Sequence, residues 1–237
     1  MKLKTADEFT PQQEESITPE PAPPPPPAPL QAIDSVRALR AIFKDPRWLQ
    51  KILLGGVVLA IPLVGFLAIL PGYGLLVVGR VARGEENTLP EWNIGECLNK
   101  GISLFIYCFA LFLGVLMILK ILRPVFSTLP LLDSLYGTFA IAAMGALWVY
   151  MLAAFAFAGA ENNPAAVLQF GRILDAMIDN PAPTLIVLIL NTASIFLAFS
   201  GVMGLYVCVI FTISLSAIFM SHIAGQFYRV AHTAGQT

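Results

Sequence analysis

Charged residues are missing from long stretches of this chain. Four segments contain no Asp, Glu, Lys or Arg, and together they make up about half of the 237 residues: 52–79, 101–119, 134–160 and 180–228. Only 12% of all residues are charged, whereas a typical soluble domain has about 25%. A water-soluble core has no need for an uncharged run as long as 180–228. The sequence therefore predicts an all-α, polytopic transmembrane helix bundle of about five to six helices.

A lack of chemical motifs narrows the possible functions. The cysteines Cys97, Cys108 and Cys208 occur singly, without the spacing of a zinc site or a disulfide framework. We expect them to be buried, inert thiols. The sequence has no phosphate-binding loop, Ser-His-Asp order or metal motif, so we expect no enzymatic activity, cofactor or metal. A net charge of −1 without a large basic cluster argues against nucleic acid as a partner.

The first 32 residues have a different composition and are predicted to be a disordered, proline-rich tail. Residues 1–20 are polar and lack the apolar core of a signal peptide, so the first apolar helix is expected to direct membrane insertion. Residues 21–29 are almost all proline and predict an extended polyproline segment. We interpret this tail as a spacer; a ligand for an aromatic-lined groove is the alternative.

Residues 33–45 predict an amphipathic helix lying in the membrane plane, because such a helix suits an anionic membrane surface. Apolar and basic residues recur at helical spacing on opposite faces: Ile33, Val36, Leu39, Ile42 and Phe43 against Arg37, Arg40 and Lys44. Pro46 disfavours helical geometry at the residue before it. We therefore expect this helix to end near Lys44 and Asp45 to cap the next one.

Residues 46–231 are predicted to form the transmembrane domain. The uncharged run 52–79 contains Pro62 and Pro71, so it is either one kinked span or a short hairpin with arms 46–61 and 63–83. The later spans are predicted at residues 101–119, 134–158, 183–200 and 205–226. A short outer loop at 124–133 and a turn at 201–204 join them.

Positive residues favour the hairpin, since cytoplasmic loops carry the excess of Lys and Arg. If the segment before residue 52 is cytoplasmic, the hairpin places ten of the flanking Lys and Arg residues inside and two outside. The single span gives seven inside and five outside. We therefore expect the hairpin, with both termini in the cytoplasm.

Two loops of the sequence are similar. Gly84, Glu86 and Asn87 recur as Gly159, Glu161 and Asn162 at a spacing of 75 residues. Each loop follows an apolar helix and leads through a short amphipathic segment into another. The similarity suggests a duplicated unit, which many transporters contain, although bundles without transport activity contain repeats too.

The first of these loops holds a candidate partner-binding site. Its charged residues and a tryptophan are expected at the membrane surface: Arg80, Arg83, Glu85, Glu86, Glu91 and Trp92. In this interpretation Trp92 anchors a docking partner. The alternative is a capped turn at the interface, with Trp92 among the lipid headgroups.

A candidate polar path lies near the C-terminus and comprises Asn191, Thr192 and His222. His222 is the only ionisable side chain inside a predicted span. Ionisable groups in spans are usually functional, but a single histidine can also be a hydrogen-bonded interfacial residue. Asn and Thr side chains can equally serve as hydrogen bonds between helices.

Several short segments together resemble a known family: FKDPRW at 43–48, GG at 55–56, IP at 61–62, GY at 72–73, GRVARGE at 79–85, LPEW at 89–92 and GQFYRVA at 225–231. They are similar to the prokaryotic integral-membrane family catalogued as domain of unknown function 4013. LPEW is the most specific segment, although the acidic residues that often follow its Trp are Asn93 and Ile94 here. The resemblance implies a multi-helix protein of a prokaryotic cell membrane. It implies no known activity.

Two functions are compatible with this sequence. The absence of buried charge and the polar loops favour a non-catalytic scaffold or accessory subunit, with the lipid bilayer and other membrane proteins as partners. The alternative is a small permease or lipid-handling protein, favoured by the repeated loop and the polar residues of the C-terminal spans. The sequence leaves the oligomeric state open.

Overall fold

A computed structural model of the chain describes residues 32–59, 61, 64–128, 130–200 and 205–234. These residues form helices joined by turns and loops, and no strand occurs among them. The predicted all-α class is therefore confirmed. The proline-rich tail and the turn at 201–204 lie outside the described residues, apart from residue 32.

The described residues form eight α-helices and two shorter helical segments. They are α1 (Ser35–Lys44), α2 (Trp48–Leu59), the π-helical segment η1 (Gly65–Ile69), α3 (Leu70–Ala82), α4 (Ile94–Phe126), α5 (Pro130–Ala160), the 3₁₀ segment η2 (Pro164–Leu168), α6 (Phe170–Asp179), α7 (Pro181–Ser200) and α8 (Leu205–Ala234). Within the described ranges, four stretches are long and apolar enough to cross a membrane: Gly65–Ala82, Ile94–Phe126, Leu135–Ala160 and Pro181–Ala198.

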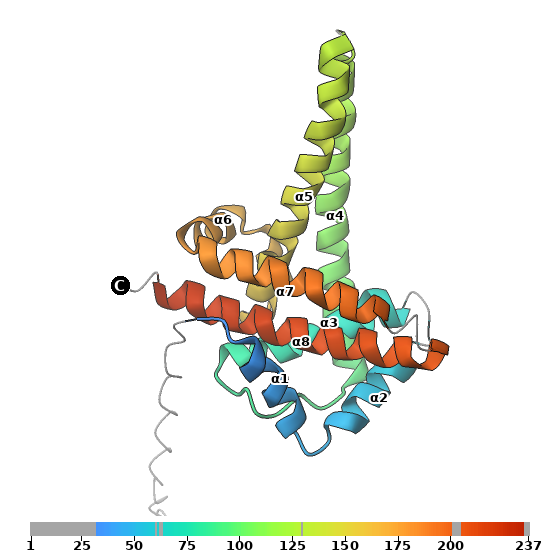
Figure 1. The fold of residues 1–237 in the computed structure, drawn as a ribbon, viewed down its shortest axis with the longest axis vertical. Helices are drawn as coiled ribbons and strands as arrows, with labels where there is room; N and C mark the ends of the chain where they lie inside the picture. The colour runs from blue at the N-terminus through green and yellow to red at the C-terminus, as the bar shows by residue number, and fades with distance from the viewer. Residues whose placement is uncertain (1–31, 60, 62–63, 129, 201–204, 235–237) are drawn as a thin grey trace, which may run out of the picture.

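Helices α4 and α5 form a pair that projects from the rest of the molecule (Figure 1). Helices α7 and α8 pack together and run across the base of this pair. Helix α8 also packs on α3, α2 and α1. Helix α8 is thus the central element, and it brings the N-terminal helices against the C-terminal ones.

The predicted break in the run 52–79 is present, since α2 ends at Leu59 and η1 begins at Gly65. A Cβ atom on Gly65 would lie 2.0 Å from the Val58 carbonyl oxygen, so only glycine fits this return of the chain. Pro71 lacks the N–H that would continue an α-helical ladder, and the π-helical turn of η1 immediately precedes it. The two arms diverge beyond the turn, and α2 packs mainly on α8.

Several predicted boundaries are wrong. The span predicted at 101–119 is part of α4, which runs from Ile94 to Phe126, and α8 continues to Ala234, beyond the predicted end at residue 226. The predicted outer loop at 124–133 overlaps the end of α4 and the start of α5 and is largely helical. Pro124 is in the last turn of α4. The hydroxyls of Ser127 and Thr128 donate to the carbonyl oxygens of Pro124 and Val125, which gives the helix end hydrogen-bond partners.

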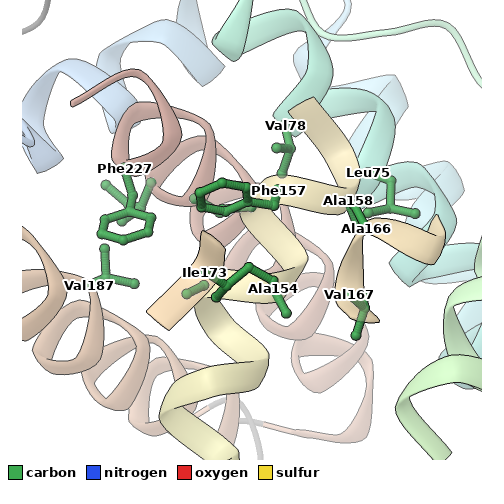
Figure 2. Packing of buried hydrophobic residues seen from close by; sticks show 14 of the residues in the cluster. Leu75, Val78, Ala154, Phe157, Ala158, Ala166, Val167, Ile173, Val187 and Phe227 are labelled. Carbon is green, nitrogen blue, oxygen red and sulfur yellow. The ribbon is translucent and has the colours of Figure 1, made fainter. Parts of the chain in front are cut away.

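The larger buried cluster joins α3, α5, η2, α6, α7 and α8 (Figure 2). Figure 2 shows Phe157 of α5 beside Val78 of α3, and Phe227 of α8 facing Val187 of α7. Helix packing within lipid depends on close van der Waals contact, because lipid is as apolar as the side chains. Alanines of α5 allow this contact, and Ala154 and Ala156 are fully buried.

Helix α4 approaches α3 and η1 at one glycine each. A Cβ atom on Gly72 would lie 1.8 Å from the Cys97 carbonyl oxygen, and one on Gly101 would lie 1.7 Å from that of Ala68. These backbones touch directly. Gly137 and Gly145 of α5 are different, because a Cβ atom at either position would meet no described atom within 4 Å.

Candidate functional site

The candidate partner-binding loop starts where α3 ends. Gly84 has a φ of 84°, and the amides of Gly84 and Glu85 donate to the carbonyl oxygens of Val81 and Arg80 at 2.9 Å each. This is the glycine-terminated helix end that reverses a chain. The reversal sends residues 84–93, which we call the return loop, back along α1 and α2.

Helix α5 ends with the same type of turn, but at a different register. Asn162 has a φ of 54°, and the Asn163 amide donates to the Ala158 carbonyl oxygen at 3.0 Å. Asn162 is thus the structural equivalent of Gly84, whereas the sequence similarity pairs Gly84 with Gly159, a residue within α5. The two loops therefore contain the same type of turn, but at positions that the sequence similarity does not pair.

Glu86 is buried between two arginines that are distant in sequence. Its carboxylate lies 2.5 Å from Nε of Arg37 in α1 and 2.5 Å from Nη1 of Arg229 in α8. The Glu86 side chain is 5% exposed. His222 Nε2 lies 3.2 Å from the Glu86 carbonyl oxygen. A buried carboxylate is tolerated when it is paired and hydrogen-bonded, and this pairing connects the return loop to both α1 and α8.

Gln226 strengthens the same junction. Its Oε1 atom accepts from the Asp34 amide at 2.9 Å, and its Nε2 atom donates to the Asp34 carbonyl oxygen at 3.2 Å. The Asp34 side chain caps α1 by accepting from the Arg37 amide. The start of α1 is therefore held against α8 by a side chain that pairs with the backbone.

A second polar cluster holds the middle of the return loop. Lys51 Nζ donates to Asp45 at 3.0 Å and to the Leu89 carbonyl oxygen at 2.7 Å. The Leu89 amide donates to Asp45 at 2.8 Å, and the Arg47 amide does so at 2.7 Å. Burial by itself raises a carboxyl pKa, but these donors outweigh it and hold the pKa of Asp45 below its ordinary value.

Trp92 also packs against this junction and is partly buried. Its indole ring stacks on Tyr73 with centroids 3.9 Å apart and planes inclined by 6°. Its Nε1 atom donates to the Lys51 carbonyl oxygen at 3.0 Å, while the Tyr73 hydroxyl donates to that of Pro90 at 3.0 Å. Every residue from Leu89 to Trp92 thus contacts α2 or α3, since Lys51 lies 3.2 Å from Glu91.

The six predicted partner-binding residues divide into two groups. Glu86 and Trp92 turn towards the protein, and the Arg80 side chain is only 32% exposed. Arg83, Glu85 and Glu91 are mostly exposed, at 56%, 52% and 71%. The sequence did not identify the partners that hold the loop, because Arg37 and Arg229 are far from it along the chain. The resemblance segment at 225–231, which contains Arg229, was the available signal for one of them.

A polar cavity of about 450 Å³ opens between α1 and the return loop. Charges of both signs line it, including Arg37, Arg40, Lys44, Asp34 and Glu86. In the described part of the chain, no three His, Cys, Asp or Glu side chains are grouped so as to hold a metal ion.

The three residues of the predicted polar path lie in different surroundings. His222 belongs to the junction around Glu86. Thr192 is exposed and donates to the Leu188 carbonyl oxygen of its own helix at 2.9 Å. Asn191 alone faces a cavity between helices. One hydrogen bond between these two helices comes from Thr212 of α8, which donates to the Ala198 carbonyl oxygen of α7 at 3.2 Å.

The Asn191 cavity lies between α7, α8 and η1. It measures about 360 Å³ and is lined by Asn191, Ser194, Ser216 and apolar residues, among them Phe66 and Met220. An apolar cavity of about 580 Å³ shares Phe66, Asn191 and Met220 with it. The Asn191 amide nitrogen and both serine hydroxyls are buried and have no hydrogen-bond partner among the described residues. Each such group costs about 1–3 kcal/mol.

Comparison with known proteins found one family. The sequence model of the family described as "Protein of unknown function (DUF4013)" matches residues 55–208. That range includes the LPEW segment and excludes the resembling segments at 43–48 and 225–231. No curated protein and no solved structure matches the chain. The match covers more than half of the sequence, and the chain therefore belongs to the DUF4013 family.

Proposed function

We propose that this protein is a non-catalytic scaffold or accessory subunit of a complex in a prokaryotic cell membrane. The observation that carries the proposal is the α4–α5 pair, which projects from the rest of the molecule (Figure 1). Few residues of its apolar segments are buried. Large exposed residues of α4 include Phe105, Ile106, Phe109, Phe112, Leu113, Met117, Ile118 and Ile121. Such a surface belongs in lipid or against the helices of a partner.

The dimensions of α4 support a membrane location. Its uncharged segment 101–119 is about 28 Å long at 1.5 Å per residue, close to the hydrocarbon thickness of about 30 Å. Lys120 and Arg123 follow at the tip, while Glu96 and Lys100 lie at the opposite end of the helix. The apolar part of α4 thus has charged residues at both ends.

The other end of the molecule supports a docking role. Buried ion pairs fix the return loop, so that Arg83, Glu85 and Glu91 are presented on a rigid support. Helix α1 lies beside this surface and exposes Val36, Leu39 and Phe43 as an apolar stripe, which supports its proposed position at the membrane surface. The Lys and Arg distribution supports placing this end in the cytoplasm.

Co-purification tests the scaffold function. A tagged protein, extracted in mild detergent after crosslinking in cells, should retain a membrane partner that also recovers it in the reciprocal experiment. Reversing the exposed charges by Arg83→Glu and Glu85→Lys should reduce recovery, because both residues are on the proposed docking surface. Lys120→Glu at the opposite end is the control. Recovery of the protein alone in every detergent would contradict the proposal.

A second candidate function is lipid handling, favoured by the Asn191 cavity between the spans. Reconstituted liposomes would then show lipid movement across the bilayer that falls with Asn191→Leu and persists with Thr192→Val. Equal lipid movement in the two variants would show that the cavity has no role in transport.

A further inference from the structure

We propose that the Asn191 cavity binds an uncharged lipid, with a carbonyl oxygen of its head held by Asn191, Ser194 and Ser216. The proposal extends the lipid-handling function by naming the ligand. A role of the bound lipid in transport rests on the proposed lipid-handling function. Lipid binding itself depends on the cavity alone.

The three polar groups face one space from two helices. Asn191 and Ser194 are one turn apart on α7, and Ser216 is on α8. All three line the cavity of about 360 Å³. Their residues are 7%, 4% and 6% exposed, so bulk water does not compensate them. Polar groups that converge in a concave, apolar space are the usual features of a small-molecule site.

The helical backbone does not prevent the hydroxyls of Ser194 and Ser216 from forming hydrogen bonds. A serine or threonine in a helix can donate to the carbonyl oxygen four residues earlier. Thr192 of α7 and Ser221 of α8 do so, at 2.9 and 2.7 Å. Ser194 and Ser216 lie on the same two helices, yet their hydroxyls have no partner in the residues described. The Ser214 hydroxyl of α8 is unpartnered as well but lines neither cavity, so Asn191, Ser194 and Ser216 are the unpartnered groups that a ligand in the cavity can reach.

The lining indicates the chemistry of the ligand head. Neither cavity is lined by Asp, Glu, Lys or Arg, so a charged head would be desolvated without a counter-charge. The amide nitrogen of Asn191 is a donor, and each serine hydroxyl can donate. A carbonyl oxygen accepts two hydrogen bonds, so two of the three converging donors satisfy it and the third is left for a second oxygen of the head. An ester of a neutral glycerolipid and the ring of a membrane quinone both supply a carbonyl oxygen.

The adjoining cavity has room for the apolar tail. It measures about 580 Å³ and continues from Asn191 to apolar residues of α4 and α5, such as Leu104, Phe105 and Phe155. Two residues of its lining reach the surface, since Phe66 is 55% exposed and Trp148 is 51% exposed. With α4 and α5 in a bilayer, this opening faces lipid, and a ligand can enter without passing through water.

Photolabelling tests the site. The full-length protein in phosphatidylcholine nanodiscs is exposed to a monoacylglycerol that carries a diazirine and an alkyne in its acyl chain. We expect saturable labelling of peptides from η1, α4 and α5, because these elements line the cavity for the acyl chain. Excess unlabelled monoacylglycerol or a decyl-chain benzoquinone should compete, and the stronger competitor identifies the source of the carbonyl. Labelling that neither compound reduces would overturn the proposal.

Variants separate ligand binding from folding. Asn191→Leu and Ser216→Ala should each lower saturable labelling about five- to tenfold, the loss expected for one hydrogen bond to the head. The thermal midpoint without added lipid should stay constant or rise, because each change removes an unpartnered buried group. Thr192→Val, one residue away on the exposed face, is the matched control and should label fully.

The outcomes distinguish the site from transport. Loss of labelling in both variants, without loss of thermal stability, supports the site even if liposomes show no lipid movement. In that case lipid handling fails and the binding site stands. Full labelling in both Asn191→Leu and Ser216→Ala contradicts the site, whatever the transport result.

Discussion

Glu86 connects three parts of the chain through a single carboxylate. Its two oxygens lie 2.5 Å from the guanidinium groups of Arg37 and Arg229. Replacing it by glutamine removes the negative charge that balances both arginines, one of which is 8% exposed. Buried charges without compensation are destabilising by several kcal/mol.

We therefore expect Glu86→Gln to lower the free energy of unfolding by about 3 kcal/mol. The thermal midpoint in detergent should fall by roughly 5–10 °C. The matched control is Glu85→Gln, since the neighbouring Glu85 is 52% exposed and its ion pairs are long, at 3.4 and 4.0 Å. Exposed pairs contribute less than about 1 kcal/mol. Equal midpoints for the two variants would show that Glu86 is not needed to hold the loop.

Asp45 makes the stability of the folded protein depend on pH in the acidic range. Its pKa is lowered in the folded protein, because hydrogen bonds from Arg47, Lys51 and Leu89 outweigh the effect of burial. The folded state thus binds this proton less tightly than the unfolded state. The stabilisation by Asp45 is complete above the ordinary carboxyl pKa of about 3.9 and is lost as pH falls through the lowered value.

We predict that the thermal midpoint of the wild type is insensitive to Asp45 between pH 8 and 5 and falls steeply below about pH 4. Asp45→Asn should have a lower midpoint at pH 7 and a shallower fall in acid. Asp179→Asn, at an exposed position of α6, is the control. Parallel curves for Asp45→Asn and the wild type would contradict this assignment.

Single residues were the hardest features to predict from sequence. Trp92 and Glu86 were correctly placed in one loop, but both turn inward, because their partners Tyr73 and Arg229 approach only in the folded chain. Asn191 was identified from polarity alone. Its unpartnered amide depends on the arrangement of α7 against α8, which hydrophobic patterning does not specify.

Glycines set the distance between elements. Gly101 of α4 meets η1 so closely that a Cβ atom would lie 1.7 Å from the Ala68 carbonyl oxygen. Gly114, in the same helix, has no atom within 4 Å of a Cβ position among the described residues. The two positions form a matched pair with the same helix, the same residue type and opposite surroundings.

Gly101→Ala should therefore separate α4 from η1 and lower the thermal midpoint by roughly 5 °C or more, because overpacked contacts cost about 1–3 kcal/mol. Gly114→Ala should leave the midpoint equal or slightly higher, since alanine favours helix over glycine. A large loss at Gly114 together with none at Gly101 would show that this crossing is not the close contact described.

Helices were predicted well where charge and proline mark them. The absence of charge located α4, α5, α7 and α8, and the two prolines located the break between α2 and η1. The ends were less accurate. Helix α4 continues through Lys120, Arg123 and Pro124. Hydropathy indicates where the apolar part of a helix ends, but not where its backbone hydrogen bonds end.

At the scale of the whole molecule, the two ends of the protein lie at opposite ends of the α4–α5 pair (Figure 1). The return loop, α1 and the end of α8 meet at one end through Glu86. The other end is the tip, where α4 leads into α5. Helices α7 and α8 run across this pair, so at least one of the two helix pairs lies tilted in a bilayer. At 30 residues, α8 is long enough for such a tilt.

Cysteine accessibility tests this arrangement most directly. Asn87→Cys in the return loop and Ser127→Cys at the tip, both at exposed positions, are introduced separately after Cys97, Cys108 and Cys208 have been replaced by alanine. The cysteine-free protein is the control. A membrane-impermeant maleimide should label position 127 in intact cells and position 87 only after permeabilisation. Labelling of both positions in intact cells, or of position 87 alone, would contradict a bilayer-spanning α4–α5 pair with a cytoplasmic return loop.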